Sequence, residues 1–460
     1  MSDRGRHDRS EIADLTSWAS SLEWEDLPRD VRSAAVLHLL DAYGVAVASG
    51  AMPFGSRLLA SLPEGGAGPA RIIGSDRRVD PLRAALVNGT LVHGLEYDDT
   101  HIASVIHGSA VALGAAFSEA QRDEVTVGDV LVGFVVAWEV MVRLGLLAPG
   151  AFQARGFQTA AVCGAPAAAL ATGRLRRSSA RVMGEAFGIA TSFSSGLMAY
   201  AADGATVKRS HLGWAAHGGV AAIDLAEAGL TGPGRPVTAT NGFLAVFAGQ
   251  SEPSGMAEVF GDVGRRWHLI DAAYKLYPVC HYIHSYLDLV DGLRRRHDAQ
   301  TIGAIRCRVH PAVVPVISDD EAQRRRPRSF EEAQYSLHYA VAQMYLAGHC
   351  TIEDLQDPTI PAVLDLASRV EAPVDPDLDF PGMFPAVIEL LDHEGRLLEE
   401  ATIRGPRGAT VAPIDLLEEI RAKFVANTSA RWSKATAEAM FEQLSSPDLA
   451  THGPASERFF

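Results

Sequence analysis

Residues 93–117 read HGLEYDDTHIASVIHGSAVALGAAF. The first fifteen residues of this stretch contain three histidines, three acidic residues and a threonine, and the remainder is small and uncharged, as in a buried helix. Ionisable groups are costly to bury unless they are paired or take part in chemistry, so this cluster is a candidate site. A solvated acidic loop with ordinary histidines would have the same composition, and the rest of the chain must discriminate between the two.

Helical patterns surround this stretch on both sides. Residues 31–50 change from amphipathic to almost wholly apolar, as a helix that enters a core does. Asp80 before Pro81 predicts the start of a second helix. Thr126 followed by Asp129 predicts a third helix that begins with a capping box.

The helices expected later in the chain are rich in alanine and glycine. They cover residues 160–175, 178–200 and 211–230. Small side chains let helix axes approach closely, so these segments predict a compact, close-packed helical domain over residues 8–268.

The pattern changes towards the C-terminus. Residues 304–310, AIRCRVH, alternate with period two and predict a half-buried strand. Residues 386–403 predict two strands around a DHEG turn, and residues 329–348 predict one amphipathic helix. We therefore expect an α+β domain at 269–405, followed at 406–445 by helices that return to the first domain.

The composition narrows the class of protein. The chain has 460 residues, of which 47% are apolar and 21% charged, so a globular protein with more than one domain is expected. The net charge of −15 argues against a nucleic-acid partner. The four cysteines are scattered without a C-x-x-C pair, which argues against a disulfide framework and a local zinc site.

The chain ends and the apolar runs bear on location. The N-terminal segment is polar and has no apolar signal core. The run at 131–147 comes closest to a membrane helix, but Glu139 and Arg143 interrupt it. We therefore predict a cytoplasmic protein without membrane contact, and we expect the final THGPASERFF, residues 451–460, to be a loose tail.

Four further segments combine charged, amide and imidazole side chains with helical patterns. They contain Arg155 and Gln158; Asp203, Lys208, Arg209, His211 and His217; Lys275, Tyr277, His281 and His284; and Gln334, Ser336, His338 and Tyr339. Each segment alone has an ordinary interpretation, such as a solvated helix end or histidines packed beside tyrosines. Together they provide lysines that could bind carboxylates and histidines that could transfer protons.

Other kinds of site are less consistent with the sequence. His93, His101 and His107 with Asp98 or Asp99 could be metal ligands, but neither H-E-x-x-H spacing nor a short bracketing pair is present. The sequence also lacks the G-x-G-x-x-G, P-loop and G-x-S-x-G motifs. This favours chemistry carried out by side chains alone.

The order of these segments resembles the MmgE/PrpD family. The matching segments, between about residues 10 and 430, are H-G-L-E-Y-D-D-T-H…H-G-S, G-F-Q-T-A-A-V-C-G, D-G-A-T-V-K-R-S-H, K-L-Y-P-V-C-H and Q-Y-S-L-H-Y. That family includes 2-methylcitrate dehydratases, cis-aconitate decarboxylases and iminodisuccinate epimerases. The resemblance implies a mainly α fold, with a large all-helical domain completed by the C-terminal segment and a smaller α+β lid domain. It also implies a homodimer without metal or organic cofactor, and a small di- or tricarboxylate substrate bound between the domains.

The resemblance further implies the residues of the site. The implied catalytic residues are His107, Lys208, Lys275, Tyr339 and Asp99. The implied substrate-binding residues are Glu96, Thr100, Gln158, Arg209, His211 and His284. In this interpretation His107 transfers the proton and the two lysines hold carboxylates. Asp99 and Thr100 orient the substrate or the histidine, and Tyr339 assists a leaving hydroxyl.

The sequence departs from the family pattern at the acidic loop and before the Ala/Gly helix. Glu96 replaces the first aspartate of D-F-D-D-T, and Gln158 stands where the family commonly has the histidine of G-F-H-x-T. Ala160 replaces the threonine of that second motif. Glutamine can hydrogen-bond a carboxylate but cannot carry a proton at neutral pH, so we expect a difference in substrate or reaction, or a loss of activity.

The predicted function is a cofactor-independent carbon–oxygen lyase, a hydro-lyase, acting on a 2-methylcitrate-like hydroxy-polycarboxylate. An epimerase, isomerase or decarboxylase on a related di- or tricarboxylate is the nearest alternative, because it shares proton transfer next to a carboxylate. A non-catalytic carboxylic-acid-binding protein is the alternative from another class, and Gln158 is the residue that favours it.

Overall fold

The chain divides into two units, and helices make up most of the described structure. The computed structural model describes residues 11–63, 68–122, 124–202, 205–250, 255–380, 382–445 and 453–459. Helices account for 58% of it and strands for 8%, which confirms the predicted fold class. Unit 1 contains Met1–Tyr200, Ala205–Ala273 and Leu417–Phe460, and unit 2 centres on Tyr274–Leu416. The sequence predicts the corresponding boundaries at residues 268 and 405.

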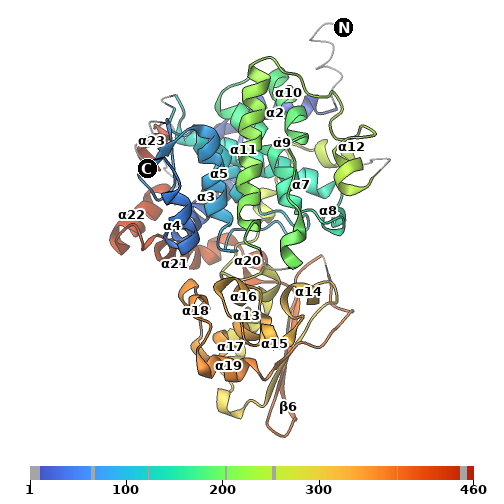
Figure 1. Cartoon of the computed structure of the whole chain (residues 1–460), viewed down its shortest axis with the longest axis vertical. Helices are drawn as coiled ribbons and strands as arrows, with labels where there is room; N and C mark the ends of the chain where they lie inside the picture. The colour runs from blue at the N-terminus through green and yellow to red at the C-terminus, as the bar shows by residue number, and fades with distance from the viewer. Residues whose placement is uncertain are drawn as a thin grey trace. The chain divides into compact units, whose positions relative to one another are not determined.

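Unit 1 is built from helices, with one short hairpin of β1 (Ala70–Arg71) and β2 (Arg78–Val79). Its helices before unit 2 are α2 (Ala13–Ser21), α3 (Arg29–Ala51), α4 (Pro53–Ala60), α5 (Pro81–His93), α6 (Gly108–Glu119), α7 (Val127–Leu146), α8 (Ala151–Ala154), α9 (Thr159–Leu175), α10 (Ala180–Thr191), α11 (Lys208–Glu227) and α12 (Met256–Phe260). The helices after unit 2 are α21 (Leu417–Thr428), α22 (Lys434–Ser445) and α23 (Ala455–Arg458). Figure 1 shows α11 between α5 and α9, and it packs against both.

The predicted helix starts are confirmed where side chains cap them. The side chain of Asp80 accepts a hydrogen bond from the backbone N–H of Arg83 at 2.9 Å, at the start of α5. Thr126 and Asp129 form the predicted capping box at the start of α7. These bonds satisfy backbone N–H groups that a helix leaves unpaired at its first turn.

Small residues allow α11 to pack closely against its neighbours, as predicted. A Cβ atom at Gly213 would lie 2.1 Å from the carbonyl oxygen of Leu86 in α5. A Cβ atom at Gly219 would lie 2.3 Å from the side chain of Ala168 in α9. Larger residues at these positions would push the helices apart, so the glycines allow α5, α9 and α11 to pack closely.

The charges that interrupt the apolar run of α7 are buried. Arg143 donates to Asp262 at 2.5 Å and to the backbone carbonyl of Arg266 at 2.7 Å. Glu139 accepts hydrogen bonds from the backbone N–H groups of His268 and Leu269 at 2.7 and 3.0 Å. Buried charges require such partners, so α7 fixes the segment before unit 2 onto the helical core.

One helix in the described part of the chain, α3, is long and apolar enough to cross a membrane. Within the structure, 83% of its most apolar window is buried. It packs against α5, α6, α7 and α21, the packing expected of a core helix.

The prediction of a loose C-terminal tail is wrong for residues 453–459. Phe459 is buried, its carbonyl oxygen accepts a hydrogen bond from the Tyr43 hydroxyl at 2.7 Å, and its ring lies 5.2 Å from that of Phe117. The backbone N–H of Ala455 also donates to the carbonyl of Val125. The segment is mostly polar, which favours a loose tail, but the buried side chain of Phe459 anchors it.

Unit 2 combines helices with a four-stranded sheet. Its sheet has the order β4-β3-β5-β6, in which β3 pairs parallel with β4 and antiparallel with β5. The strands are β3 (Ala304–Arg308), β4 (Val370–Glu371), β5 (Ala386–Leu391) and β6 (Leu397–Ile403). The helices are α13 (His281–Arg294), α14 (Val314–Ile317), α15 (Glu321–Arg324), α16 (Phe330–Gln334), α17 (Leu337–Ala347), α18 (Ile352–Gln356), α19 (Pro361–Ala367) and α20 (Arg407–Thr410). The predicted strand at 304–310 and the predicted hairpin at 386–403 are both confirmed.

The single helix predicted at 329–348 is wrong. The structure has α16 and α17 there, separated at Tyr335 and Ser336. The Ser336 hydroxyl oxygen accepts a hydrogen bond from the backbone N–H of Tyr339 at 2.9 Å, so Ser336 caps a new helix. Serine competes with a continuing helix in this way, and apolar periodicity alone does not reveal the break.

Candidate active site

The candidate site lies in unit 1, around the loop that joins α5 to α6. Thr100 exchanges two backbone hydrogen bonds with Ala273, at 3.0 and 2.8 Å. Glu96 has a φ angle of 53°, in the left-handed region that residues other than glycine rarely adopt. Such a conformation persists where surrounding contacts hold it, and it is common at functional sites.

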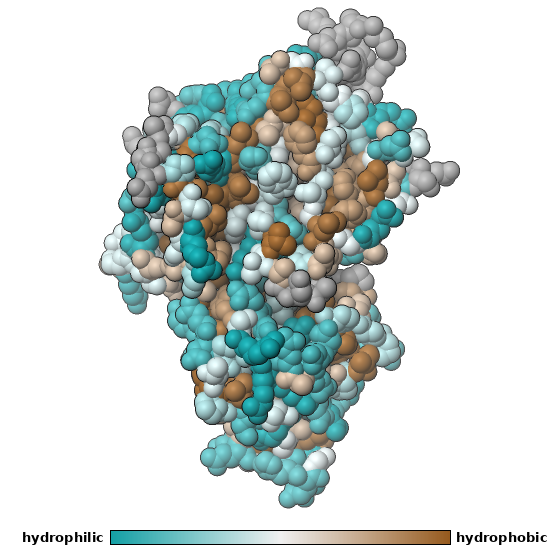
Figure 2. Space-filling view, viewed as in Figure 1, coloured by the Kyte–Doolittle hydropathy of each residue, from teal (hydrophilic) through white to brown (hydrophobic). Residues whose placement is uncertain are grey.

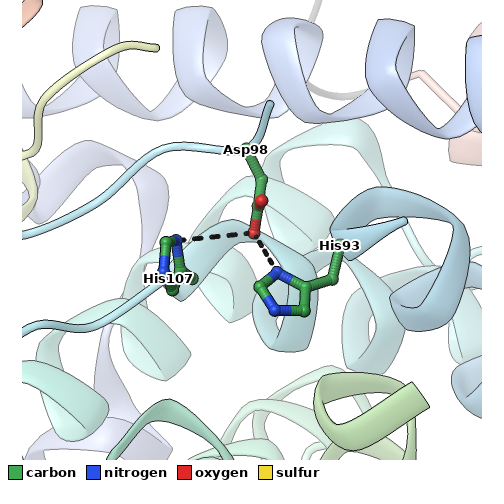
Figure 3. Close-up of side chains that lie close together, drawn as sticks. All are labelled: His93, Asp98 and His107. Atoms are coloured by element: carbon green, nitrogen blue, oxygen red, sulfur yellow. Dashed lines mark hydrogen bonds and ion pairs between the residues drawn. The ribbon is translucent and has the colours of Figure 1, made fainter. Parts of the chain in front are cut away.

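His93, Asp98 and His107 converge at this loop (Figure 3). The Oδ2 atom of Asp98 accepts a hydrogen bond from Nδ1 of His93 at 2.8 Å and lies 3.9 Å from Nδ1 of His107. The two imidazole rings are 5.1 Å apart, centre to centre. His93 and Asp98 are buried, whereas the His107 side chain is 13% exposed, so His107 is the more accessible of the two rings.

The contacts of His107 determine its neutral tautomer. Its Nδ1 atom lies 3.1 Å from the backbone carbonyl oxygen of Asp99 and 3.1 Å from Oγ1 of Thr100. A carbonyl oxygen can only accept, so Nδ1 carries the hydrogen and the lone pair of the neutral ring is on Nε2. The proton transfer predicted for His107 would therefore use Nε2.

Gln158 connects His93 to α11. Its Nε2 atom donates to Nε2 of His93 at 3.1 Å, and its Oε1 atom accepts from Nδ1 of His211 at 2.8 Å. Because Asp98 holds the hydrogen of His93 on Nδ1, this orientation of the amide satisfies both imidazoles. Gln158 thus sets the tautomer of two histidines without carrying a proton itself.

His211 is neutral at physiological pH. Burial lowers its pKa to about 4, and the nearby His93 and Lys208 add to the shift. Since its Nδ1 hydrogen is used by Gln158, its lone pair lies on Nε2. His211 is therefore a second imidazole that could accept a proton.

The start of α11 contributes the positive charge of the site. Lys208 donates to Oε1 of Glu96, and both side chains are largely buried. The Lys208 ammonium is therefore paired with the carboxylate of Glu96. The guanidinium of the adjacent Arg209 instead lies 4.3 Å from the centre of the Phe54 ring, in a cation–π contact.

Asp99 points into the core beneath the loop. Its Oδ2 atom accepts from Nδ1 of His38 at 2.7 Å and from the Ser109 hydroxyl at 2.5 Å. Trp138 donates to that same hydroxyl at 3.1 Å. A Cβ atom at Gly108 would lie 2.4 Å from the Trp138 ring, so glycine is needed where α6 begins. The side chain of Asp99 thus supports the loop, and its backbone carbonyl orients His107.

The sequence-predicted residues fall into two groups. Unit 1 brings together Glu96, Asp99, Thr100, His107, Gln158, Lys208 and His211, whereas the guanidinium of Arg209, also in unit 1, lies on the Phe54 ring. Lys275, His284 and Tyr339 belong to unit 2. The Tyr339 hydroxyl donates to the backbone carbonyl of Asp354 at 3.3 Å, and burial raises its pKa to about 12. His284 contacts Tyr277 and His281 edge to face.

Asp203 and His101 also belong to the sequence-predicted segments. Asp203, which opens the segment before α11, lies outside the described residues. His101 contacts a different set of residues, with its Nδ1 atom 2.8 Å from the Ser104 hydroxyl and its ring against His268.

A metal ion is a weaker fit to this donor set than hydrogen bonding. Ligand atoms of His93, Asp98 and His107 lie within 4.8 Å of one another, which is close enough to consider a metal. However, the Nδ1 atoms of both histidines carry hydrogens directed at oxygen acceptors. A metal ligand must be deprotonated, so binding through these atoms would break both contacts.

Residue patterns missed several members of the site. The sequence indicates His93 and Asp98 only as possible metal ligands, whereas in the structure they form the central hydrogen bond of the cluster. Their position within the same acidic stretch is the signal that could have identified them. His38 of α3 binds Asp99, and Lys423 of α21 donates to the backbone carbonyl of Tyr97 at 2.8 Å. Both come from distant helices, where a histidine or lysine usually has an ordinary role, and no sequence signal marks them.

Comparison with known proteins shows which family this chain matches. Residues 13–256 match the MmgE/PrpD N-terminal domain, and residues 277–446 match the MmgE/PrpD C-terminal domain. A cis-aconitate decarboxylase of Aspergillus terreus is 29% identical over 412 residues, which cover 85% of this chain and 81% of that protein. The cis-aconitate decarboxylase-like protein oryM of Aspergillus oryzae is 28% identical over 90% of this chain and 89% of its own length. The cis-aconitate decarboxylase of Homo sapiens is 30% identical over 66% of this chain and 63% of its own length. The chain is a member of the MmgE/PrpD family.

Proposed function

We propose that this protein is a lyase that acts on a small tricarboxylate, and that it removes carbon dioxide from a cis-aconitate-like substrate. The observation that carries the proposal is the carboxylate of Glu96 on the Lys208 ammonium, next to a cluster of hydrogen-bonded histidines. This contact has the chemistry that a substrate carboxylate would make with the same lysine. The similarity to curated cis-aconitate decarboxylases supports decarboxylation as the reaction.

The residues of unit 1 can supply what such a reaction requires. The bond between carbon and the leaving carboxylate breaks, and its electron pair forms a new carbon–carbon double bond. The carbon at the far end of the old double bond then takes one proton. His107, in its protonated form, would deliver that proton from Nε2 and be left as the neutral ring, because its Nδ1 hydrogen stays on the Asp99 carbonyl. Asp98, 3.9 Å from Nδ1, would attract the positive charge on the ring before transfer.

Lys208 would hold the negative charge of the substrate while electrons move. The substrate carboxylate would share or replace the contact that Glu96 makes with the ammonium. Lys275 and Tyr339 of unit 2 remain proposed members of the machinery, as a second carboxylate ligand and a hydrogen-bond donor. These roles need no metal or organic cofactor, as the sequence predicts.

The hydro-lyase predicted from the sequence is the second candidate. The observation that favours it is the pair of imidazoles whose Nδ1 hydrogens are held by oxygen acceptors, His107 and His211. His211, neutral with its lone pair on Nε2, could accept the proton as the base, and His107, once protonated on Nε2, could donate a proton to the leaving hydroxyl. A 2-methylcitrate-like hydroxy-acid would then be the substrate.

An assay of the purified protein tests the proposal. It would be incubated in deuterated water with cis-aconitate, citrate and 2-methylcitrate, and the products followed by NMR and carbon dioxide release. Decarboxylation predicts one deuterium per product molecule and one carbon dioxide. Release or addition of water without carbon dioxide would replace the proposal by the hydro-lyase, and thermal stabilisation without turnover would favour the acid-binding alternative.

We also propose the homodimer that the family resemblance implies. Unit 1 exposes several large apolar side chains, including Leu197, Val207 and Trp214, at 61%, 50% and 48% exposure. Figure 2 shows apolar surface among polar surface on the face that carries α11. Light scattering on the purified protein tests this, and a monomer at micromolar concentration would contradict it.

A further inference from the structure

We propose that Lys423, on the C-terminal helix α21, is a positioning residue that holds the active-site loop in its working geometry. The inference rests on the proposed function, because it assigns a role for that same site. Lys423 does not touch the reacting groups that we assign, and it would act through the loop.

Lys423 makes a buried set of contacts to the loop and to α3. Its Nζ atom lies 2.7 Å from Oδ1 of Asp41 and donates to the backbone carbonyl of Tyr97 at 2.8 Å. It also lies 3.9 Å from the centre of the Tyr97 ring. The side chains of Lys423 and Asp41 are 5% and 1% exposed, so the ion pair is almost fully removed from water.

The position of these contacts along the loop gives them their importance. Tyr97 immediately precedes Asp98, whose side chain binds His93, and Asp99, whose carbonyl binds His107. Displacement of the Tyr97 carbonyl would therefore move both imidazole partners together. A shift of this kind can slow a reaction even when every reacting residue is present.

A second anchor on α3 makes the arrangement specific. His38 lies one helical turn before Asp41 and donates to the Asp99 side chain at 2.7 Å. Helix α3 thus holds the loop directly at Asp99, and through Lys423 at Tyr97. Burial raises the pKa of Asp41 and lowers that of Lys423, and the attraction between them opposes both shifts. The charged pair is costly to bury, which argues that it is retained for a geometric reason.

The ion pair between Asp41 and Lys423 joins two residues that are far apart in the sequence. Asp41 and Lys423 are 382 residues apart, and all of unit 2 lies between them. The C-terminal segment therefore does more than cover the apolar face of α3. It supplies the cation that the loop requires.

Lys423→Met tests the proposal, because it removes the ammonium and keeps most of the length. Lys434→Met on α22 is the matched control, since its side chain is 79% exposed. We expect hydrogen exchange of the Thr100 amide to rise about tenfold to a hundredfold in Lys423→Met, the range that a hydrogen bond to a charged group contributes. We expect kcat to fall about a hundredfold with little change in KM, because Lys208 still binds the substrate. The control should match the wild type in both measurements.

A double variant separates positioning from stability. Lys423→Met alone leaves Asp41 buried without its cation, which could unfold the protein. Asp41→Asn with Lys423→Met removes both charges and should recover the thermal stability. Because methionine cannot donate to the Tyr97 carbonyl, the rapid exchange and the low kcat should persist. Recovery of kcat together with stability, or wild-type exchange and kcat in Lys423→Met, would overturn the proposal.

The exchange measurement also distinguishes this inference from the proposed function. If the wild type turns over none of the three acids, the proposed function fails, yet the exchange at Thr100 still reports on the loop. Faster exchange in the double variant would then support the anchoring role, and unchanged exchange would exclude it.

Discussion

Two polar clusters of unit 1 each include histidine from the fifteen residues 93–107, and their neighbours differ. One contains His93, Asp98 and His107, and the other contains His101, His268 and Asp271. In the first cluster the imidazoles face a carboxylate, an amide and a backbone carbonyl. In the second, burial lowers the pKa of His101 to about 3 and that of His268 to about 4, and neighbouring arginines add to both shifts. Residue type is shared, and the neighbours decide which imidazole can carry a proton.

Charged side chains from α7 and from the segment before unit 2 surround the second cluster. Arg143 and Arg266 approach His268, and Arg266 is paired with Asp271 at 2.5 Å. Beside them, burial raises the pKa of Glu139 to about 7. These groups join α7 to the segment before unit 2, so we interpret the second cluster as structural.

The largest expected effect compares one histidine from each cluster. His107→Gln should lower kcat by about 10²–10⁴, the usual contribution of a general acid or base. His101→Gln should leave kcat near the wild-type value at pH 7, because its imidazole is already neutral. Steady-state kinetics with cis-aconitate measure both, and equal losses in the two variants would contradict the distinction between the clusters.

Removing the positive charge beside the first cluster should have the next largest effect. Lys208→Met should lower kcat/KM by about 10²–10³, as the loss of one charge-stabilising donor does. The exposed Lys434→Met serves as the control for loss of a lysine. Because Glu96 would lose its partner, Glu96→Gln with Lys208→Met separates lost substrate binding from an unpaired acid. Full activity in Lys208→Met would remove Lys208 from the site.

The second cluster should be detected in acid. The folded-state pKa of His101 is about 3, below its ordinary value of 6.5, so its contribution to stability is present above pH 6.5 and is lost as the pH falls. At pH 5, the free energy of unfolding lost through His101 amounts to about 2 kcal/mol. His101→Gln should therefore flatten the loss of unfolding free energy between pH 6.5 and 4. Urea unfolding at several pH values measures it, with the exposed His393→Gln as control, and an unchanged slope would disagree with the pKa shift.

The smallest expected effect concerns the amide that orders the first cluster. Gln158→Leu removes hydrogen bonds to His93 and His211 and should lower kcat about tenfold. Nitrogen NMR should also report a loss of the single tautomer at His211. If both the tautomer of His211 and kcat are unchanged, Gln158 does not orient the two histidines.

Local rules predicted much of the fold. The caps at Asp80 and Thr126 act within three residues, so the sequence contains all of their partners. Alternation with period two identified β3 and the β5–β6 hairpin. The same local rules failed at Ser336, where a side chain ends a helix, and in the terminal segment, where Phe459 packs against residues more than 300 positions away. The homodimer and the cytoplasmic location stay predictions.

The order of motifs identified the family and nominated His107, Lys208 and Gln158, because these residues lie in short recognisable segments. Only the tertiary structure decided how they are used. The sequence suggested Asp99 as the acid that orients the substrate or the histidine, whereas in the structure the Asp98 side chain binds His93 and the Asp99 side chain binds His38 in the core. It also brought Lys423 to the loop from the far end of the chain. Buried hydrogen bonds and ion pairs depend on three-dimensional contact, and no periodicity or spacing in the sequence encodes such pairs.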